Sequence, residues 1–385
     1  MLATLTVAAT LLAQDKIDFP EVAWHVSLAR GAPTVSDDSV YSGGYGLFRI
    51  DRASGEILAE VDRVEPAGVP GEADGQGVQL VYAEAPTVST ERVVARKLDG
   101  SVVAFDRELT RQLWSWTGQG GSWPRPGVLV GDTYFLADGW NVVALKAVDG
   151  SLLWKRALAG TVDMTPAVAN GLVFAGTSTG VFQALDAATG EPAWTAEGFG
   201  PFAASNPIVR NGVVYVGDRG LDRGTERAPF NSSTIDLDSS RSGALLAFDA
   251  ETGEQRWGRT FGATGLSDPF VSKKAVFAGF GKVVAQFDRE TGEIDKGSMV
   301  HTGRNPFGSP TVIGERLYFG NLDGHLYVHR LEGGALEWAF AVPNAQVHDF
   351  AHTGSRIFVS TTKGLFALVP GKKGKGGSTL VWQGE

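Results

Sequence analysis

The sequence predicts an all-β fold, an eight-bladed β-propeller of four-stranded antiparallel blades, and three observations predict it. A motif that begins with glycine, contains Asp-x-x-Thr-Gly and ends with tryptophan recurs along the chain, most clearly at Gly180–Trp194 and Gly243–Trp257. A second motif, centred on a proline such as Pro166 or Pro207, precedes the copies at a period of about 40 residues. Each unit holds four short apolar runs. Four strands per unit, repeated around an axis, form a β-propeller.

The four apolar runs of one unit are Pro166–Ala169, Leu172–Gly176, Val181–Leu185 and Pro192–Ala196. Each run is short, contains β-branched or aromatic residues and is bounded by Gly, Asn, Asp or Ser, which is typical of strands joined as hairpins. Outside the N-terminus, the sequence has no long stretch with helical periodicity. We name the four strands A, B, C and D from the centre of the ring to its rim.

The Asp-x-x-Thr-Gly segment predicts the turn between strands C and D. The carboxylate of Asp186 is expected to accept backbone hydrogen bonds as an Asx turn. Gly190 is expected to adopt a positive φ, which glycine does without steric cost. These residues therefore have a structural role in every blade that retains them.

A tryptophan recurs once per unit on strand D, and we expect it to pack between blades rather than to perform chemistry. Replacing Trp154 or Trp194 with alanine should cost about 3–5 kcal/mol of stability. The motif departs from this pattern at Ile57 or Leu58 and at Ile294. The tryptophans expected to pack in this way are Trp114, Trp154, Trp194, Trp257 and Trp338.

The unit resembles the PQQ-like propeller repeat, named after pyrroloquinoline-quinone enzymes, over the motif cores Ala184–Trp194 and Ala247–Trp257. The resemblance extends over essentially the whole chain after the N-terminal segment. Within this family, the length and repeat number are similar to those of outer-membrane assembly factors of the BamB type. That resemblance implies a scaffold that binds other envelope proteins.

Composition limits the function classes. The chain has 385 residues, a net charge of −9 and no basic stripe, which argues against nucleic acid and anionic membranes as partners. Its 51 glycines fit a fold with many tight turns. It contains no cysteine, which excludes disulfides, thiolate metal sites and thiol nucleophiles within this sequence, and no lipid-attachment box is visible.

The N-terminal residues 1–14 contain an apolar run that is too short to span a bilayer and fits a signal peptide. This predicts a periplasmic or secreted protein without a transmembrane segment. Residues 22–385 are then expected to form a single propeller and to be monomeric. Both Trp24 and Trp382 match strand D of the repeat, so either terminal segment is a candidate for the strand that closes the ring.

Two insertions interrupt the 40-residue rhythm, at residues 64–82 and 218–242. The first lies between a D strand and the next A strand, and the second lies between strands B and C of blade five. Because strand direction alternates, both connections emerge on the same face of the ring. Long loops in a tight repeat often carry function, although tolerated surface variation is the alternative.

Side chains of this face are candidates for binding a partner or ligand. Trp123, Arg125, His301 and Arg304 are expected near the mouth of the channel, and Trp and Arg are enriched in binding hot spots. The second insertion adds Arg219, Arg223 and Arg227. His348 and His352 are four residues apart on a predicted A strand, where they either bind a metal, sense pH or fill space as hydrogen-bonded side chains.

No convergent set of catalytic residues is apparent, and the sequence predicts neither a cofactor nor a metal site. The favoured hypothesis is a non-enzymatic binding or scaffolding propeller of the cell envelope, whose partner is another envelope protein. The alternatives are a quinone-dependent dehydrogenase and a propeller that recognises carbohydrate or peptide. The fold alone does not decide among them, because function resides in the site.

Overall fold

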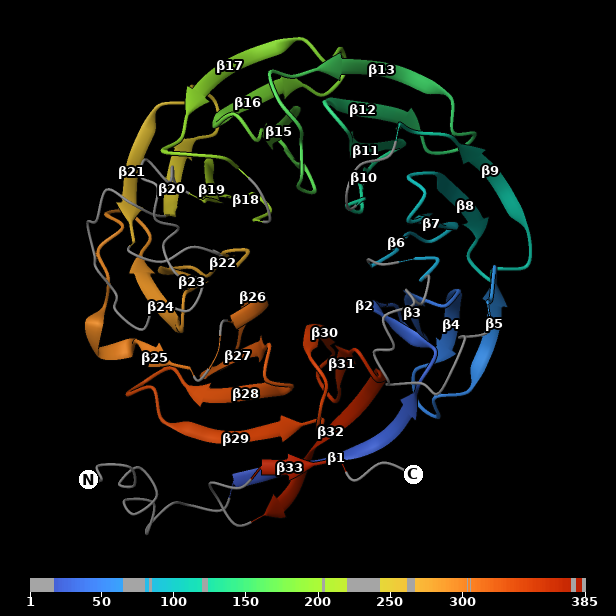
Figure 1. The fold of residues 1–385 in the computed structure, drawn as a ribbon, viewed down its shortest axis with the longest axis vertical. Coiled ribbons are helices and arrows are strands. Elements are labelled where there is room, and N and C mark those ends of the chain that lie inside the picture. Colours follow the sequence, from blue (N-terminus) through green and yellow to red (C-terminus); the bar gives the residue numbers. More distant parts are fainter. Residues whose placement is uncertain are drawn as a thin grey trace.

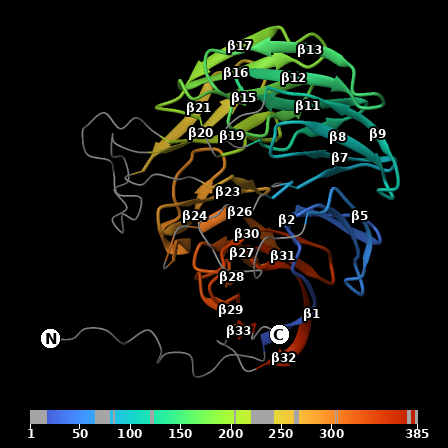
Figure 2. The ribbon, with the colours of Figure 1, turned by 45° about the vertical axis from the view of Figure 1, so that its right-hand side comes forward.

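The computed structural model describes residues 17–64, 80–82, 85–119, 124–202, 205–219, 243–261, 267–302, 304, 306–374 and 379–382. These residues form eight antiparallel sheets arranged around a central axis, which confirms the predicted eight-bladed propeller (Figure 1). Viewed obliquely, the blades lie side by side as a closed ring (Figure 2). No helix in the described part of the chain is long and apolar enough to cross a membrane.

The first four blades follow one another along the chain, each with strands A to D in order. Blade one consists of β2 (Ala29–Val35), β3 (Ser39–Gly44), β4 (Leu47–Asp51) and β5 (Ile57–Val61). Blade two consists of β6 (Thr87–Val88), β7 (Arg92–Arg96), β8 (Val102–Asp106) and β9 (Gln112–Trp116). Blade three consists of β10 (Val128–Val130), β11 (Thr133–Asp138), β12 (Asn141–Lys146) and β13 (Leu152–Ala157). Blade four consists of β14 (Ala167–Ala169), β15 (Leu172–Gly176), β16 (Val181–Asp186) and β17 (Pro192–Glu197).

The last four blades continue the ring and contain the first and the last of the described strands. Blade five consists of β18 (Ile208–Arg210), β19 (Val213–Asp218), β20 (Ala244–Asp249) and β21 (Gln255–Thr260). Blade six consists of β22 (Phe270–Val271), β23 (Ala275–Phe280), β24 (Val283–Asp288) and β25 (Val300–His301), with a 3-10 turn at Lys296–Ser298 before β25. Blade seven consists of β26 (Pro306–Ile313), β27 (Arg316–Asn321), β28 (His325–Arg330) and β29 (Leu336–Ala341), with β33 (Thr379–Val381) added outside. Blade eight consists of β30 (Val347–His352), β31 (Ile357–Thr361), β32 (Gly364–Gly374) and β1 (Ile17–Val26).

The N-terminal strand closes the ring. β1 pairs antiparallel with β32 and is strand D of blade eight, with Trp24 opposite Ala367. The C-terminal strand β33 instead pairs parallel with β29, where Leu380 lies opposite Phe340. Of the two candidates, Trp24 therefore occupies the strand D position, on a strand that the structure describes from Ile17 onward.

The repeated tryptophan joins each blade to the next. Trp154 of blade three donates a hydrogen bond from Nε1 to the carbonyl oxygen of Ala187 in blade four, at 3.0 Å. Its ring lies against Gly190 of the same turn, where an added Cβ would be 2.6 Å from Cε3. The same indole-to-carbonyl bond, at 2.8–3.2 Å, is made by Trp24, Trp114, Trp154, Trp194 and Trp257.

Blade one lacks this tryptophan, and a tyrosine takes over its hydrogen bond. Tyr41 on β3 donates from its hydroxyl to the carbonyl oxygen of Arg107 in blade two, at 2.8 Å. Arg107 follows the turn aspartate Asp106, as Ala187 follows Asp186. Trp338 of blade seven has no such turn to face, because strand D of blade eight comes from the N-terminus; it is buried beside Tyr318.

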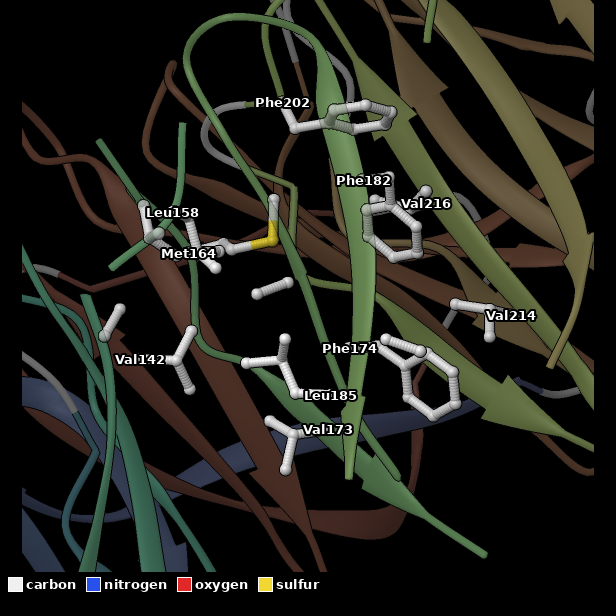
Figure 3. Packing of buried hydrophobic residues seen from close by; sticks show 14 of the residues in the cluster. Val142, Leu158, Met164, Val173, Phe174, Phe182, Leu185, Phe202, Val214 and Val216 are labelled. Carbon is white, nitrogen blue, oxygen red and sulfur yellow. The ribbon is translucent and has the colours of Figure 1, made fainter. Parts of the chain in front are cut away.

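The core lies between the blades rather than within one sheet. Val142 of blade three, Phe174 and Phe182 of blade four and Val214 of blade five belong to one buried cluster (Figure 3). Apolar residues on both faces of each sheet are covered by the neighbouring blades. This burial is the main stabilising term, and it requires that the ring be closed.

Candidate functional site

The candidate site is the face on which the B–C and D–A connections emerge, which we call the loop-bearing face. Both insertions fall in such connections, since β5 precedes the first and β19 precedes the second. Residues 65–79 and 220–242 lie outside the described part of the chain, and so do Trp123, Arg223 and Arg227. The bases of both insertions are described, and they show how this face is anchored.

The base of the first insertion is fastened by three side chains. The hydroxyl of Tyr82, the last residue of the insertion, donates to Oδ2 of Asp62, which precedes the insertion, at 2.5 Å. Lys97 of blade two forms an ion pair with the same oxygen, at 2.8 Å. Tyr82 is buried against Gly43, since a Cβ added to Gly43 would lie 2.9 Å from the Cβ of Tyr82. Both ends of the loop are therefore held to each other and to the next blade.

The electrostatics of this base favour a charged aspartate and a neutral tyrosine. Burial alone would raise the pKa of Asp62, but the hydrogen bonds from Lys97 and Tyr82 outweigh it and lower that pKa. Burial, together with the neighbouring Asp62 carboxylate, raises the pKa of Tyr82 far above its ordinary value. The tyrosine thus remains a hydrogen-bond donor at physiological pH and holds the loop base together.

The base of the second insertion is organised by Asp218, which is buried at the end of β19. Its Oδ2 accepts hydrogen bonds from the backbone nitrogens of Phe199, at 2.7 Å, and Gly200, at 3.2 Å. Its Oδ1 accepts from the nitrogen of Ala244 beyond the insertion, at 2.9 Å. One carboxylate therefore joins both ends of the insertion to the D–A loop of the preceding blade.

Asp138 occupies the corresponding position in blade three and is also buried. Its Oδ1 accepts from the backbone nitrogen of Gln119 in the preceding D–A loop, at 2.8 Å. Arg96 and Lys155 lie 3.5 and 3.4 Å from its carboxylate oxygens. Arg96 also donates to the carbonyl oxygen of Arg125, at 3.1 Å, which ties the start of the inner strand β10 to blade two.

Polar residues of the inner strands bond to neighbouring blades. Thr34 of blade one donates to the carbonyl oxygen of Pro86, at 2.6 Å, and Thr87 of blade two donates to that of Gly127, at 2.9 Å. Asn206 of blade five accepts from the backbone nitrogen of Thr165, at 2.7 Å, and itself donates to Asp268 of blade six. These hydroxyl, amide and carboxylate groups contribute to the architecture of the channel wall.

The described arginines among the candidates spread around this face. Arg125 lies before β10 of blade three and is half-buried. Arg219 is exposed at the base of the second insertion, where its nitrogen donates to the carbonyl oxygen of Pro201, at 2.9 Å. Arg304 is exposed between blades six and seven, and its carbonyl oxygen accepts from Asn321, at 3.0 Å. They belong to different blades and do not form one compact pocket.

The histidines differ from one another in environment. His301 is exposed on β25, the rim strand of blade six, opposite Val283, rather than in the loop at the channel mouth. A register shift in β30 separates His348 from the regular pairing, and His348 is half-buried while His352 is exposed. Burial lowers the pKa of His348, and a hydrogen bond with the Arg30 backbone partly offsets this.

Sequence reasoning missed two exposed aromatic residues on this face. Trp140 lies in the B–C turn of blade three and is 57% exposed, and Phe199 lies in the D–A loop after β17 and is 48% exposed. Trp140 could have been found by comparing the B–C turns, because this turn holds the polar residues Thr179 in blade four and Asp323 in blade seven, so a tryptophan is unusual there. Phe199 had no comparable signal, since D–A loops vary in sequence.

The described polar groups of this face have structural partners. The buried carboxylates Asp138 and Asp218 accept several structural hydrogen bonds each. The exposed side chains include the aromatic residues Trp140 and Phe199 and the cationic residue Arg219, beside acidic and neutral polar residues such as Asp99 and Gln119. Among the described residues, no group of three His, Asp or Glu is placed to hold a metal ion.

Comparison with known proteins agrees with this description. The chain matches a family model described as outer membrane protein assembly factor BamB, over residues 18–124, 115–226 and 222–295. BamB of Moranella endobia is 25% identical over 329 residues, which cover 72% of this chain and 83% of that protein. A quinohemoprotein alcohol dehydrogenase of Pseudomonas putida is 30% identical over 148 residues, which cover 34% of this chain but only 18% of that enzyme.

A solved structure supports the fold independently of sequence. The crystal structure of BamB from Moraxella catarrhalis matches with a TM-score of 0.64 at 17% identity, and the match covers 91% of this chain and 100% of that one. At this identity, the likeness shows the fold alone. The family model, in contrast, matches well over half of the chain. The chain therefore belongs to the family of the outer membrane protein assembly factor BamB.

Proposed function

We propose that this chain is a non-enzymatic scaffold of the cell envelope that binds another envelope protein through its loop-bearing face. The observation that carries the proposal is the family match over residues 18–295, because members of this family are described as outer membrane protein assembly factors. The alignment with BamB of Moranella endobia covers 72% of this chain and 83% of that protein, so the likeness extends over most of the ring and not over a few repeats.

The physical character of the loop-bearing face supports binding over catalysis. Its ionisable groups Asp62 and Asp218, of which Asp218 is buried, hold loop bases by hydrogen bonds. Its exposed groups include Trp140, Phe199 and Arg219, which contribute contact area and charge to a partner. A rigid ring that carries variable loops suits a scaffold, because the loops can specify the partner without altering the core.

The proposed location is the periplasm or the extracellular side, with an envelope protein as partner. The apolar N-terminal run within residues 1–14 supports export, and these residues lie outside the described part of the chain. The relatives named as outer membrane assembly factors support the same compartment.

The quinoprotein alternative has weaker support. The matched quinohemoprotein alcohol dehydrogenase shares only 148 aligned residues with this chain, which is the extent of about four repeats. A shared repeat explains that likeness, since the motif residues Asp186, Gly190 and Trp194 are turn and packing residues. The wild-type protein should therefore show no dye-linked oxidation of alcohols when pyrroloquinoline quinone and calcium are added.

The proposal is tested by affinity purification of the tagged protein from envelope extracts. Wild type should retain an outer-membrane assembly protein, and the Phe199→Ser/Arg219→Glu variant should retain about tenfold less, because both side chains lie on the loop-bearing face. The matched control is Arg210→Glu, which reverses a charge on the same blade at the opposite face. Equal recovery with both variants, or no reproducible partner for wild type, would contradict the proposal.

A further inference from the structure

Blade three carries a row of exposed apolar side chains at the end of the ring opposite the loop-bearing face. Val130 ends strand A, Val148 lies in the C–D turn, and Leu152 and Leu153 begin strand D. Their exposed fractions are 47%, 52%, 52% and 50%. The A–B and C–D turns that bring them to this end are hydrogen-bonded, since the nitrogen of Ala147 donates to the carbonyl oxygen of Asp132, at 2.8 Å.

At the matching positions of blade five, the side chains are polar or charged rather than apolar. Register identifies the matching positions of any two blades, because Leu145 pairs with Leu152 as Phe248 pairs with Gln255. The positions that correspond to Val130, Val148, Leu152 and Leu153 are polar or charged in blade five, where they are Arg210, Glu251, Gln255 and Arg256. The repeat itself therefore does not require apolar residues there, and their exposure to solvent calls for a different explanation.

The row borders an open sheet edge. Within the described residues, β13 pairs only with β12, so the outer edge of the strand has backbone groups without a strand partner. Leu153 is the extra residue of a β-bulge between the pairs Ala144–Trp154 and Leu145–Leu152. Exposed edges of this kind accept added strands, with backbone hydrogen bonds for affinity and side-chain contacts for specificity.

The chain itself shows what such an edge accepts. On blade seven, β33 adds parallel to the rim strand β29, with Thr379 opposite Ala339 and Val381 opposite Ala341. The apolar residues Leu380 and Trp382 of this segment pack against the blade seven and eight core. An extended apolar segment that runs parallel to strand D is therefore compatible with the rim of a blade.

The equivalent part of blade three can be identified from the strand pairing. Trp338 pairs with Val328 as Trp154 pairs with Ala144, so Lys155–Ala157 corresponds to the part of β29 that holds β33. A longer parallel segment would begin beside Leu152 and Leu153 and end beside Ala157. Its first residues would meet the exposed leucines, and its last would bond to the backbone of β13.

We propose that the β13 edge of blade three is a docking site for an extended, apolar β-strand segment of a partner polypeptide, added parallel to β13. This inference rests on the proposed scaffold function but uses a different surface from the loop-bearing face. The second ligand class is an unpaired strand with alternating apolar side chains, whereas the partner proposed above is a folded envelope protein. The scaffold would thereby contact a folded partner at the loop-bearing face and an extended segment at the rim of blade three.

The test uses the purified full chain and a fluorescein-labelled peptide, LSVSTLVWQ, in which the β33 sequence follows residues that provide apolar contacts for Leu152 and Leu153. Fluorescence anisotropy should show saturable binding, and Leu152→Gln/Leu153→Gln should weaken it about tenfold or more. Hydrogen exchange of residues 152–157 should slow in the complex. Both leucines are half-exposed, so the variant is expected to fold, which circular dichroism checks.

The matched control is Leu58→Gln, which changes an exposed leucine at the same bulge position of blade one and should leave affinity unchanged. A peptide with alternate backbone nitrogens methylated should not bind, because it lacks the amide donors that strand pairing needs. Equal binding of the methylated and unmethylated peptides would overturn the proposal. Undiminished binding of the peptide by Leu152→Gln/Leu153→Gln would also overturn it, because the peptide would then be replacing β33 on blade seven instead of binding blade three. Self-association that the double variant abolishes would also overturn it. The proposed function is tested separately: Phe199→Ser/Arg219→Glu should lose the envelope partner but should still bind the peptide.

Discussion

At the scale of the residue, one contact recurs around the ring: an indole of one blade rests on the turn glycine of the next. Trp154 illustrates it, with its Nε1 bonded to Ala187 and its ring against Gly190. The predicted turn is confirmed, since Asp186 Oδ1 accepts from the nitrogens of Ala188 and Thr189, at 3.0 and 2.8 Å, and Gly190 has a φ of 72°. The turn thus connects two strands of its own blade and also contacts the tryptophan of the preceding blade.

Gly190→Ala should therefore be more destabilising than Gly171→Ala, although both glycines have similar positive φ values of 72° and 76°. Each alanine costs about 1–2 kcal/mol in the left-handed backbone region. At Gly190 the new Cβ also meets the Trp154 ring, whereas at Gly171 no atom lies within 4 Å. Overpacking should add about 1–3 kcal/mol to the loss at Gly190. Urea unfolding measures both variants, and equal losses would show that the indole contact does not constrain the turn.

At the scale of the element, strands B and C were the most predictable, because their short apolar runs between Gly, Asn and Asp leave little choice. The run at Leu172–Gly176 is strand β15 without change. The closing strand was not predictable from its motif, since Trp24 and Trp382 both fit. In the structure, the longer pairing closes the ring: the 11-residue β32 pairs along the ten-residue β1, whereas β33 has only three residues.

The candidate site was less predictable than the fold. Strand direction placed both insertions on one face, because that follows from the alternation of strands. The environment of each side chain did not follow, because it depends on contacts between blades. His348 and His352, four residues apart, were expected to point to one side of β30, but a register shift separates them, and His348 is half-buried while His352 is exposed.

The closing strand also gives blade eight a pH dependence. His25 on β1 stacks on Phe366 at 4.2 Å, and its Nε2 lies 2.9 Å from the carbonyl oxygen of Lys363. Burial lowers the pKa of His25, partly offset by that hydrogen bond. The unfolded chain therefore binds more protons as the pH falls below about 6.5, so the free energy of unfolding decreases on acidification and is restored above that pH.

His25→Phe should reduce the loss of stability between about pH 7.5 and pH 5.5, because the variant keeps an aromatic ring on Phe366 and removes the titration. Urea unfolding at the two pH values measures this. His352→Phe, at an exposed position of the same blade, is the matched control and should leave the dependence as it is. His325 acts in the opposite sense, since its hydrogen bond with Asp323 raises its pKa. An unchanged pH dependence in His25→Phe would show that the closing strand is not the acid-sensitive element.

At the scale of the whole molecule, the ring presents two chemically different ends. One end bears the insertions, whose bases are anchored by Asp62 and Asp218 and which are flanked by exposed aromatic and cationic side chains. The other end consists of tight turns and, on blade three, an exposed apolar row beside an open strand edge. A rigid ring keeps the two ends at a fixed separation, which suits a protein that brings partners together.

Binding of an envelope protein by the loop-bearing face can be tested by site-specific photocrosslinking in intact cells. A photoreactive residue replaces Arg219 or Arg304 on the loop-bearing face, and Asn170 or Arg210 on the opposite face, all four being exposed. We expect a crosslink to an outer-membrane assembly protein from the first pair and not from the second. Crosslinks to that protein from Asn170 or Arg210 alone, or from none of the four positions, would contradict it.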